Sequence, residues 1–280
     1  MADGIELGIP GHAIALKWHR LRRRREDPVF TSRRLAEGLE LGASMEVDLR
    51  VHAEGGLVVL HEERLEYETT GVGPVRAASA EYLRGLHIRD ENGAATDNPV
   101  LLFEDLATLV RQRPPTDALV QLDFKETIDR VTRRTVESLA AAVRGIEENF
   151  ILSGGDWGAV KRLAGAGIGM GYDPCELPEA GRLASPADVA AFVDLTEQIA
   201  PEAEMIYLDY TLILGASRLG ADIVDAFHRH ARLIDAWTLN ADHPDAAASL
   251  RELVRLRVDQ ITTDEPIRLE ELFAETGRLP

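Results

Sequence analysis

The sequence predicts an α/β protein of the (β/α)8 TIM-barrel class, with a small insertion after a hairpin extension of its second strand. Two observations carry this prediction. Along all 280 residues, short β-rich runs alternate with longer segments of helical spacing. There are eight such runs, spaced about 35 residues apart, which are the number of strands and the length of repeat unit expected of a barrel. One further apolar run returns too soon for this alternation and indicates a hairpin.

The strand candidates are short runs of β-forming, largely apolar residues. They cover 13–18, 43–49, 118–124, 149–153, 167–171, 204–209, 232–239 and 259–263. Between them, segments 31–42, 185–200 and 214–231 have helical spacing; the first opens on a Thr-Ser cap, and Ser185 caps the second with Pro186 at its first position. A doubly wound open sheet would also alternate, but it has no reason to stop at eight strands, so we favour the barrel.

The run LVVLH (57–61) follows the second strand after only RVHAEGG. A parallel neighbour needs a crossover of about a dozen residues, whereas an antiparallel neighbour needs only a tight turn. We therefore expect a hairpin that turns near Gly55-Gly56 and returns His61 beside Glu46 and Asp48. Residues 62–98 are polar and turn-rich and are expected to form a capping insertion within a single domain, 1–280.

Composition narrows the range of partners. Hydrophobic residues make up 45% and charged residues 28%, as in ordinary globular proteins. The net charge of −17 argues against nucleic acid or an anionic membrane surface as the main partner. The single cysteine, Cys175, excludes an internal disulfide and a cysteine-based metal site. No secretion signal or apolar run of about 18 residues is evident, so we expect a cytoplasmic protein without membrane insertion; homo-oligomerisation stays open.

Acidic residues gather at the ends of two predicted strands. Glu46 and Asp48 are two apart and share a strand face, and Asp123 and Lys125 repeat this spacing on the next barrel strand. Converging buried carboxylates are costly unless they are compensated, which suggests a hard cation such as Mg²⁺ or Ca²⁺. Salt bridges among these residues and nearby arginines are the alternative, and the spacing alone does not choose between them.

Two histidines are candidates for proton transfer. His19 follows the first barrel strand, at the end where barrel enzymes keep catalytic groups, and His61 arrives on the hairpin. Arg22 to Arg25 follow His19. Most of them are expected to be solvated, with Arg22 the best candidate for contact with an anion. Asp209 and Tyr207 either line the pocket or serve ion pairing and packing.

Seven sequence motifs, in the order that the barrel requires, resemble the glycerophosphodiester phosphodiesterases, relatives of the phosphatidylinositol-specific phospholipases. The resemblance covers nearly the whole chain and rests on His19-Arg20, Glu46-x-Asp48, VVLHEERL followed by TTGVGPV, NPVLLFEDL, Asp123-x-Lys125, AWTLN (236–240) and VDQITTDEP. It implies that Glu46, Asp48 and Asp123 bind a divalent cation, Mg²⁺ or Ca²⁺. His19 and His61 would be the acid–base pair, Arg20 and Lys125 would hold the phosphate, and Trp237 would line the substrate cleft.

The resemblance implies hydrolysis of a glycerophosphodiester, or a related small alcohol or sugar phosphodiester, to a phosphomonoester and an alcohol. The chain departs from the family's pattern in places: Leu21 stands where the family has glycine, Glu62 where it has aspartate, and Asp123 where it has glutamate. Two alternatives stay open. One is a phospholipase-D-like lyase that forms a cyclic phosphate; the other, motivated by these departures, is a catalytically silent barrel that binds a phosphodiester.

Overall fold

The computed structural model describes residues 2–9, 11–115 and 118–276. Within these residues ten strands form one sheet, in the order β1-β2-β12-β11-β10-β9-β8-β7-β3-β4, and β2 also pairs with β3. The two end strands, β1 and β4, pair antiparallel with β2 and β3. The other strands of this sheet are those of a closed (β/α)8 barrel, which confirms the predicted fold class.

Each predicted barrel strand overlaps an observed one. The strands are β1 Glu6–Ile9, β2 His12–Trp18, β3 Met45–Val51, β4 Leu57–Val59, β5 His87–Arg89, β6 Ala95–Pro99, β7 Val120–Phe124, β8 Phe150–Gly154, β9 Gly169–Tyr172, β10 Met205–Asp209, β11 Leu233–Trp237 and β12 Gln260–Thr263. The α-helices are α1 Ser32–Leu41, α2 Ala80–Arg84, α3 Phe103–Gln112, α4 Arg133–Val143, α5 Trp157–Ala164, α6 Pro186–Ile199, α7 Tyr210–Arg218, α8 Ile223–His228, α9 Ala246–Leu256 and α10 Pro266–Thr276.

The helix caps follow the sequence signals. The Thr31 side chain accepts a hydrogen bond from the Arg34 amide at the start of α1, and Ser185 caps α6 in the same way. The segment 214–231, expected to have continuous helical spacing, is instead divided between α7 and α8. Gly220, with φ +82°, separates the two helices because glycine adopts a left-handed conformation at little cost.

The chain divides into two compact units, which are described separately. The first unit comprises Met1–Lys17 and Met170–Pro280, and the second comprises Trp18–Gly169. The prediction of one domain over 1–280 stays a prediction. No helix in the described part of the chain is long and apolar enough to cross a bilayer.

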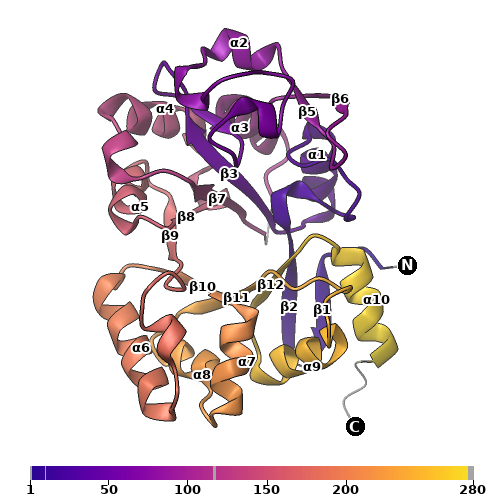
Figure 1. Ribbon diagram of the computed structural model, residues 1–280, viewed down its shortest axis with the longest axis vertical. Coiled ribbons are helices and arrows are strands. Elements are labelled where there is room, and N and C mark those ends of the chain that lie inside the picture. The colour runs from indigo at the N-terminus through magenta and orange to yellow at the C-terminus, as the bar shows by residue number, and fades with distance from the viewer. Residues whose placement is uncertain (1, 10, 116–117, 277–280) are drawn as a thin grey trace. The chain divides into compact units, whose positions relative to one another are not determined.

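The first unit contains a parallel ladder, β9-β10-β11-β12. Helices α7 and α8 pack against β10 and β11, and α6 packs on α8 (Figure 1). A charged pair is buried among these strands: the Lys17 ammonium lies 2.9 Å from the Asp235 carboxylate, and both side chains are almost fully buried. Asp235 also accepts hydrogen bonds from Gln260 and Thr262, so its oxygens are well satisfied.

The second unit contains the parallel ladder β3-β7-β8 and the hairpin arm β4. The hairpin turns where the sequence predicts: Leu49 pairs with Val59, and the His52 amide donates to the Gly56 carbonyl at 3.0 Å. Gly55 takes a φ of +79° at the turn, where glycine avoids the strain of a side chain. The hairpin prediction is confirmed.

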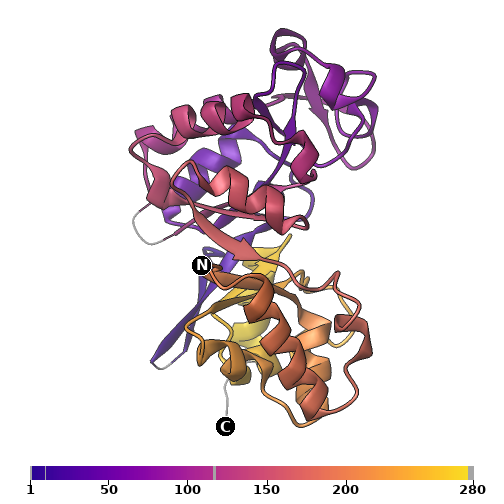
Figure 2. The ribbon, with the colours of Figure 1, turned by 90° about the vertical axis from the view of Figure 1, so that its left-hand side faces the viewer.

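Residues 62–98 are more ordered than their composition suggests. They contain the helix α2 and an antiparallel sheet of β5 and β6. In Figure 2 this segment stands out from the helices of the same unit as a small lobe. It has a core of its own, because several apolar side chains are buried within it: Leu65, Val75, Leu83, Leu86 and Ile88.

The buried Lys17–Asp235 pair generates a stability prediction. Lys17→Met should lower the free energy of unfolding by about 3–5 kcal/mol, because it leaves the Asp235 carboxylate buried without its cation. Chemical denaturation followed by circular dichroism measures the change. The double variant Lys17→Met/Asp235→Leu should recover much of the loss. Arg133→Ala, which breaks a solvent-exposed pair with Glu137, is the control and should change little. An unchanged midpoint for Lys17→Met would refute the prediction.

Candidate active site

Three carboxylates meet in the second unit. Glu46 and Asp48 lie on β3 and Asp123 on β7, and the parallel register places Asp48 directly beside Asp123. Oxygen atoms from the three side chains lie within 4.8 Å of one another. Glu46 and Asp48 are buried, with exposed fractions of 4% and 1%. The strand spacing thus brings the predicted acidic residues together.

Two cations flank the central carboxylate, Asp48. The Arg20 Nε lies 3.1 Å from Asp48 Oδ2, and the Lys125 Nζ lies 3.0 Å from Asp48 Oδ1. Lys125 also donates a hydrogen bond to Asp123. The cluster therefore keeps an excess of negative charge, since three carboxylates face one guanidinium and one ammonium.

Burial and mutual repulsion alter the acidity of the cluster. Burial, together with the neighbouring Glu46 carboxylate, raises the pKa of Asp48 to about 7, although Lys125 and Arg20 offset part of this effect. Burial also raises the pKa of Glu46. For Lys125, burial acts to lower the pKa, but the Asp123, Asp48 and Glu46 carboxylates outweigh it and raise the pKa. The protein alone thus does not fully compensate the carboxylates.

The donor atoms fit a hard divalent cation. Glu46 Oε2 accepts a hydrogen bond from the Arg20 amide at 2.8 Å, whereas Glu46 Oε1 is buried without a hydrogen-bond partner among the described residues. A buried carboxylate oxygen in this state is costly. An all-oxygen set of carboxylates is the kind of site that Mg²⁺ and Ca²⁺ prefer.

The loop after β2 carries the first predicted histidine. His19 opens a short 3₁₀ turn, His19–Leu21, and is half-buried. Arg20 and Leu21 both adopt left-handed backbone, with φ of 52° and 61°. This turn presents the Arg20 amide to Glu46 while the Arg20 guanidinium reaches Asp48. The local backbone thus directs two groups of one residue at the carboxylates of β3.

The second predicted histidine, His61, is held at its backbone on both sides. Its amide donates to Glu68 Oε2 at 2.9 Å, and its carbonyl accepts from Arg50 Nε at 2.6 Å. The Leu60 amide donates to the Asp48 carbonyl at 3.1 Å, which fixes the chain just before His61 to the strand of the acidic cluster. The His61 ring forms a 3.0 Å contact from Nδ1 to Glu62 Oε1.

Sequence reasoning did not find Glu68. Its Oε2 accepts from two consecutive amides, those of His61 and Glu62, at 2.9 and 2.7 Å. Burial raises the pKa of Glu68, opposed by the Glu62 amide and by Arg20. The only sequence signal is an acid seven residues after His61 in a turn-rich segment. Such a signal cannot identify a partner without the fold of the 62–98 insertion.

A model of the glycerophosphoryl diester phosphodiesterase family matches residues 31–268. The chain belongs to this family. It is therefore a phosphoric diester hydrolase. No curated protein matches the chain.

Several solved glycerophosphodiester phosphodiesterase structures share the fold of this family member. One from Agrobacterium tumefaciens is 22% identical, with a TM-score of 0.66 over 92% of this chain and 99% of that chain. One from Thermotoga maritima is 20% identical, with a TM-score of 0.64 over 94% and 98% of the two chains. A phosphodiesterase from Oleispira antarctica, in complex with the product sn-glycerol-3-phosphate, is 14% identical, with a TM-score of 0.68 over 92% and 96%.

The backbone at Leu21 explains one departure from the family pattern. A φ of 61° lies in the region that glycine adopts freely and that costs other residues about 1–2 kcal/mol. Leu21 is fully buried, so burial of its side chain offsets this cost. The buried leucine side chain thus compensates for a backbone conformation that glycine would adopt without strain.

The four consecutive arginines have different surroundings. Arg22 pairs with Glu91 of the insertion at 3.2 Å and lines a pocket of about 470 Å³ that Arg20 also lines. Arg23 pairs with Glu37 and lies over the Trp18 ring, 5.5 Å from its centroid. Arg24 and Arg25 are exposed. Arg22 is thus the arginine of this run that shares a pocket with Arg20.

Three residues predicted to line the cleft or pocket lie in the first unit: Trp237, Tyr207 and Asp209. Trp237 ends β11, and its indole Nε1 is buried without a hydrogen-bond acceptor among the described residues. Its role in a substrate cleft stays a prediction. Tyr207 is buried with the Lys17 ammonium 4.6 Å from its ring centroid, which indicates a packing role.

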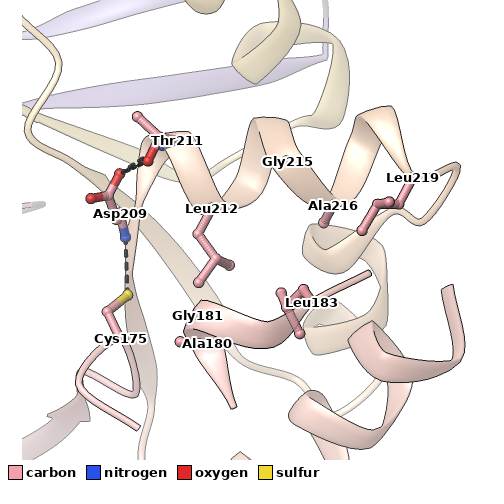
Figure 3. Close-up of a pocket in the computed structure, with 10 residues that line it drawn as sticks. All are labelled: Cys175, Ala180, Gly181, Leu183, Asp209, Thr211, Leu212, Gly215, Ala216 and Leu219. Atoms are coloured by element: carbon pink, nitrogen blue, oxygen red, sulfur yellow. Dashed lines mark hydrogen bonds between the residues drawn. The ribbon is translucent and has the colours of Figure 1, made fainter. Parts of the chain in front are cut away.

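Asp209 caps a helix and lines a separate pocket. Its carboxylate accepts from the Thr211 amide and hydroxyl at the start of α7, and its amide donates to the Cys175 sulfur (Figure 3). The pocket beside it has a volume of about 430 Å³ and is otherwise lined largely by small and apolar residues. Burial raises the pKa of the Cys175 thiol, so this sulfur is a poor nucleophile.

The Glu68 contacts generate a prediction about the His61 backbone. Glu68→Ala should increase amide hydrogen exchange at His61 and Glu62, because both amides lose their acceptor, and should cost about 1–3 kcal/mol of stability. Exchange measured by NMR checks this. Glu66→Ala is a matched control in the same insertion, since Glu66 accepts from the Gly73 amide instead. Unchanged exchange at His61 and Glu62 would contradict the proposed support.

Proposed function

We propose that this phosphodiesterase is metal-dependent and hydrolyses a glycerophosphodiester, or a related small alcohol or sugar phosphodiester, to a phosphomonoester and an alcohol. The observation that carries the proposal is the buried cluster of Glu46, Asp48 and Asp123. Two cations lie beside it, and it sits at the base of the hairpin that ends in His61.

Arg20 and Lys125 would hold the phosphate. A phosphodiester resists attack because its oxygens are anionic, and a site that neutralises this charge lowers the barrier. Arg20 contacts one carboxylate oxygen of Asp48 and Lys125 contacts the other. A phosphate beside the cluster can therefore bind both a guanidinium and an ammonium group. Arg22, which lines a pocket together with Arg20, would contact the rest of the substrate.

Glu46, Asp48 and Asp123 would hold one divalent cation, Mg²⁺ or Ca²⁺. When bound, such an ion supplies Lewis-acid polarisation of the phosphoryl group and neutralises the carboxylates. The buried Oε1 of Glu46, which lacks a partner among the described residues, supports this assignment.

His61 and His19 would form the acid–base pair. With Nδ1–H of His61 donated to Glu62, the neutral ring keeps an unprotonated Nε2 that can accept a proton from the attacking hydroxyl. His19 would then protonate the leaving alkoxide, which is otherwise a poor leaving group. The attacker is either water or a hydroxyl of the substrate.

Removal of metal tests the cofactor. The purified protein should release alcohol from glycerophosphodiesters only with Mg²⁺, Ca²⁺ or a similar ion, because three carboxylates facing a bound phosphate without a cation would repel it. Treatment with chelator should abolish the activity, and the ion should restore it. Full activity in excess chelator would exclude the proposed role of the cluster.

Histidine variants test the proton transfers. His19→Ala and His61→Ala should each lower kcat by about 10²- to 10⁴-fold, because each removes a group that moves a proton. His87→Ala, an exposed histidine on β5, is the matched control and should retain activity. Steady-state kinetics measure the effect, and near-native kcat in both site variants would refute the mechanism.

Product analysis separates the alternatives. Phosphorus NMR should show a linear phosphomonoester, whereas a lyase would release a cyclic phosphate. Binding without turnover across a panel of diesters would instead favour a silent binding protein.

A further inference from the structure

A pocket rich in basic side chains adjoins the candidate site on the side of Lys125. It has a volume of about 400 Å³, in the range of small-ligand sites. Its basic side chains are Arg50, Arg64, Arg76, Lys125 and Arg130. Because Lys125 lies 3.0 Å from Asp48, the pocket opens beside the place proposed for the phosphate. We call this cavity the basic pocket.

The basic pocket is lined by three acidic residues, Glu63, Glu126 and Asp129, and two of them make hydrogen bonds. Glu126 accepts from the Val51 amide at 3.0 Å and lies 4.0 Å from Arg50. Asp129 accepts a hydrogen bond from Thr127. Glu63 is exposed. Three carboxylates thus face five cationic side chains, so they neutralise only part of the positive charge of the pocket.

Two arginines of the basic pocket retain donors. The Arg76 guanidinium is exposed and has neither a hydrogen bond nor an ion pair within the described residues. Arg130 approaches Glu126 and Asp129 only at 3.8 Å, beyond hydrogen-bond distance. A guanidinium binds phosphate or carboxylate through paired N–H donors, so both side chains can bind a ligand anion without first losing a strong partner.

The pocket on the Arg20 side has the opposite character. Acidic side chains outnumber basic ones among the residues that line it, five to three, whereas in the basic pocket the basic ones lead by the same ratio. A phosphodiester carries two alcohols, one on each side of its phosphate. The two alcohols therefore meet opposite electrostatic environments on either side of Asp48.

We propose that the basic pocket binds a second anionic group, a phosphate or a carboxylate, on one alcohol of the diester substrate. Arg76 and Arg130 donate to this group, and the preferred substrates are diesters in which one alcohol is itself an anion. The inference rests on the proposed function, because it places the scissile phosphate beside Lys125. In a protein of net charge −17, a local basic site of this kind offsets the overall repulsion of an anionic substrate.

A set of matched substrates tests the proposal. The first substrate, glycerophosphoglycerol, has two uncharged alcohols. The second carries an additional phosphate ester on the terminal hydroxyl of one glycerol. In the third, glycerate replaces one glycerol and supplies a carboxylate. We expect kcat/KM to be about tenfold higher or more for an anionic arm, chiefly through KM. Comparison of the two anionic arms shows which anion the pocket prefers. Added salt should reduce the preference.

The variant Arg76→Ala/Arg130→Ala should remove this preference and leave kcat/KM for the neutral diester unchanged. Arg133→Ala, an exposed arginine outside the pocket, is the control and should alter neither value. Equal kcat/KM for all three substrates, or a preference that survives in the double variant, would overturn the proposal.

Failure of the proposed function gives a different result. If no diester is turned over, isothermal titration calorimetry with the same three compounds still tests the pocket. Tighter binding of the anionic diesters, lost in Arg76→Ala/Arg130→Ala, supports the pocket assignment without catalysis. Equal affinity for neutral and anionic compounds overturns it.

Discussion

The position of Asp48 between Arg20 and Lys125 is the interaction on which the candidate site depends. A carboxylate with 1% exposure is stable in the protein interior only when opposite charge surrounds it. Both cations are supplied by local structure: Arg20 by the left-handed turn after β2, and Lys125 by the residue after β7. Glu46 and Asp123 add more negative charge than these cations neutralise. This imbalance is why the cluster suits a divalent cation and an anionic substrate together.

The hairpin couples the proposed proton transfer to this cluster. β4 is paired to β3, the strand that carries Glu46 and Asp48, so the chain returns to the cluster at His61. Glu68 from the insertion and Arg50 from β3 then hold the backbone of His61 from both sides. The insertion therefore contributes directly to the surroundings of His61. It provides the carboxylate that fixes the position of a proposed catalytic group, which gives the fold of 62–98 a direct functional consequence.

Local patterns in the sequence were sufficient to predict the barrel, the hairpin and the acidic cluster. Strand alternation and the short Gly55-Gly56 turn determine these features, and the period of two places Glu46 and Asp48 on one face. Other features depend on contacts that no local pattern encodes. Glu68 reaches His61 only because the insertion folds into its own small sheet, and Arg76 and Arg130 share a pocket although they are far apart in sequence. The sequence also did not predict the left-handed backbone conformation of Leu21, since leucine rarely adopts it.

Calorimetric titration of the metal-free protein with Mg²⁺ or Ca²⁺ tests the central claim most directly, because it does not depend on the identity of the substrate. The account predicts one divalent ion per chain, bound with release of heat or protons, and a large loss of affinity in Asp123→Asn. Asp129→Asn, an acid outside the cluster, should bind the ion as the native protein does. Absence of binding, or equal binding by Asp123→Asn, would contradict the assignment of Glu46, Asp48 and Asp123 as a metal site.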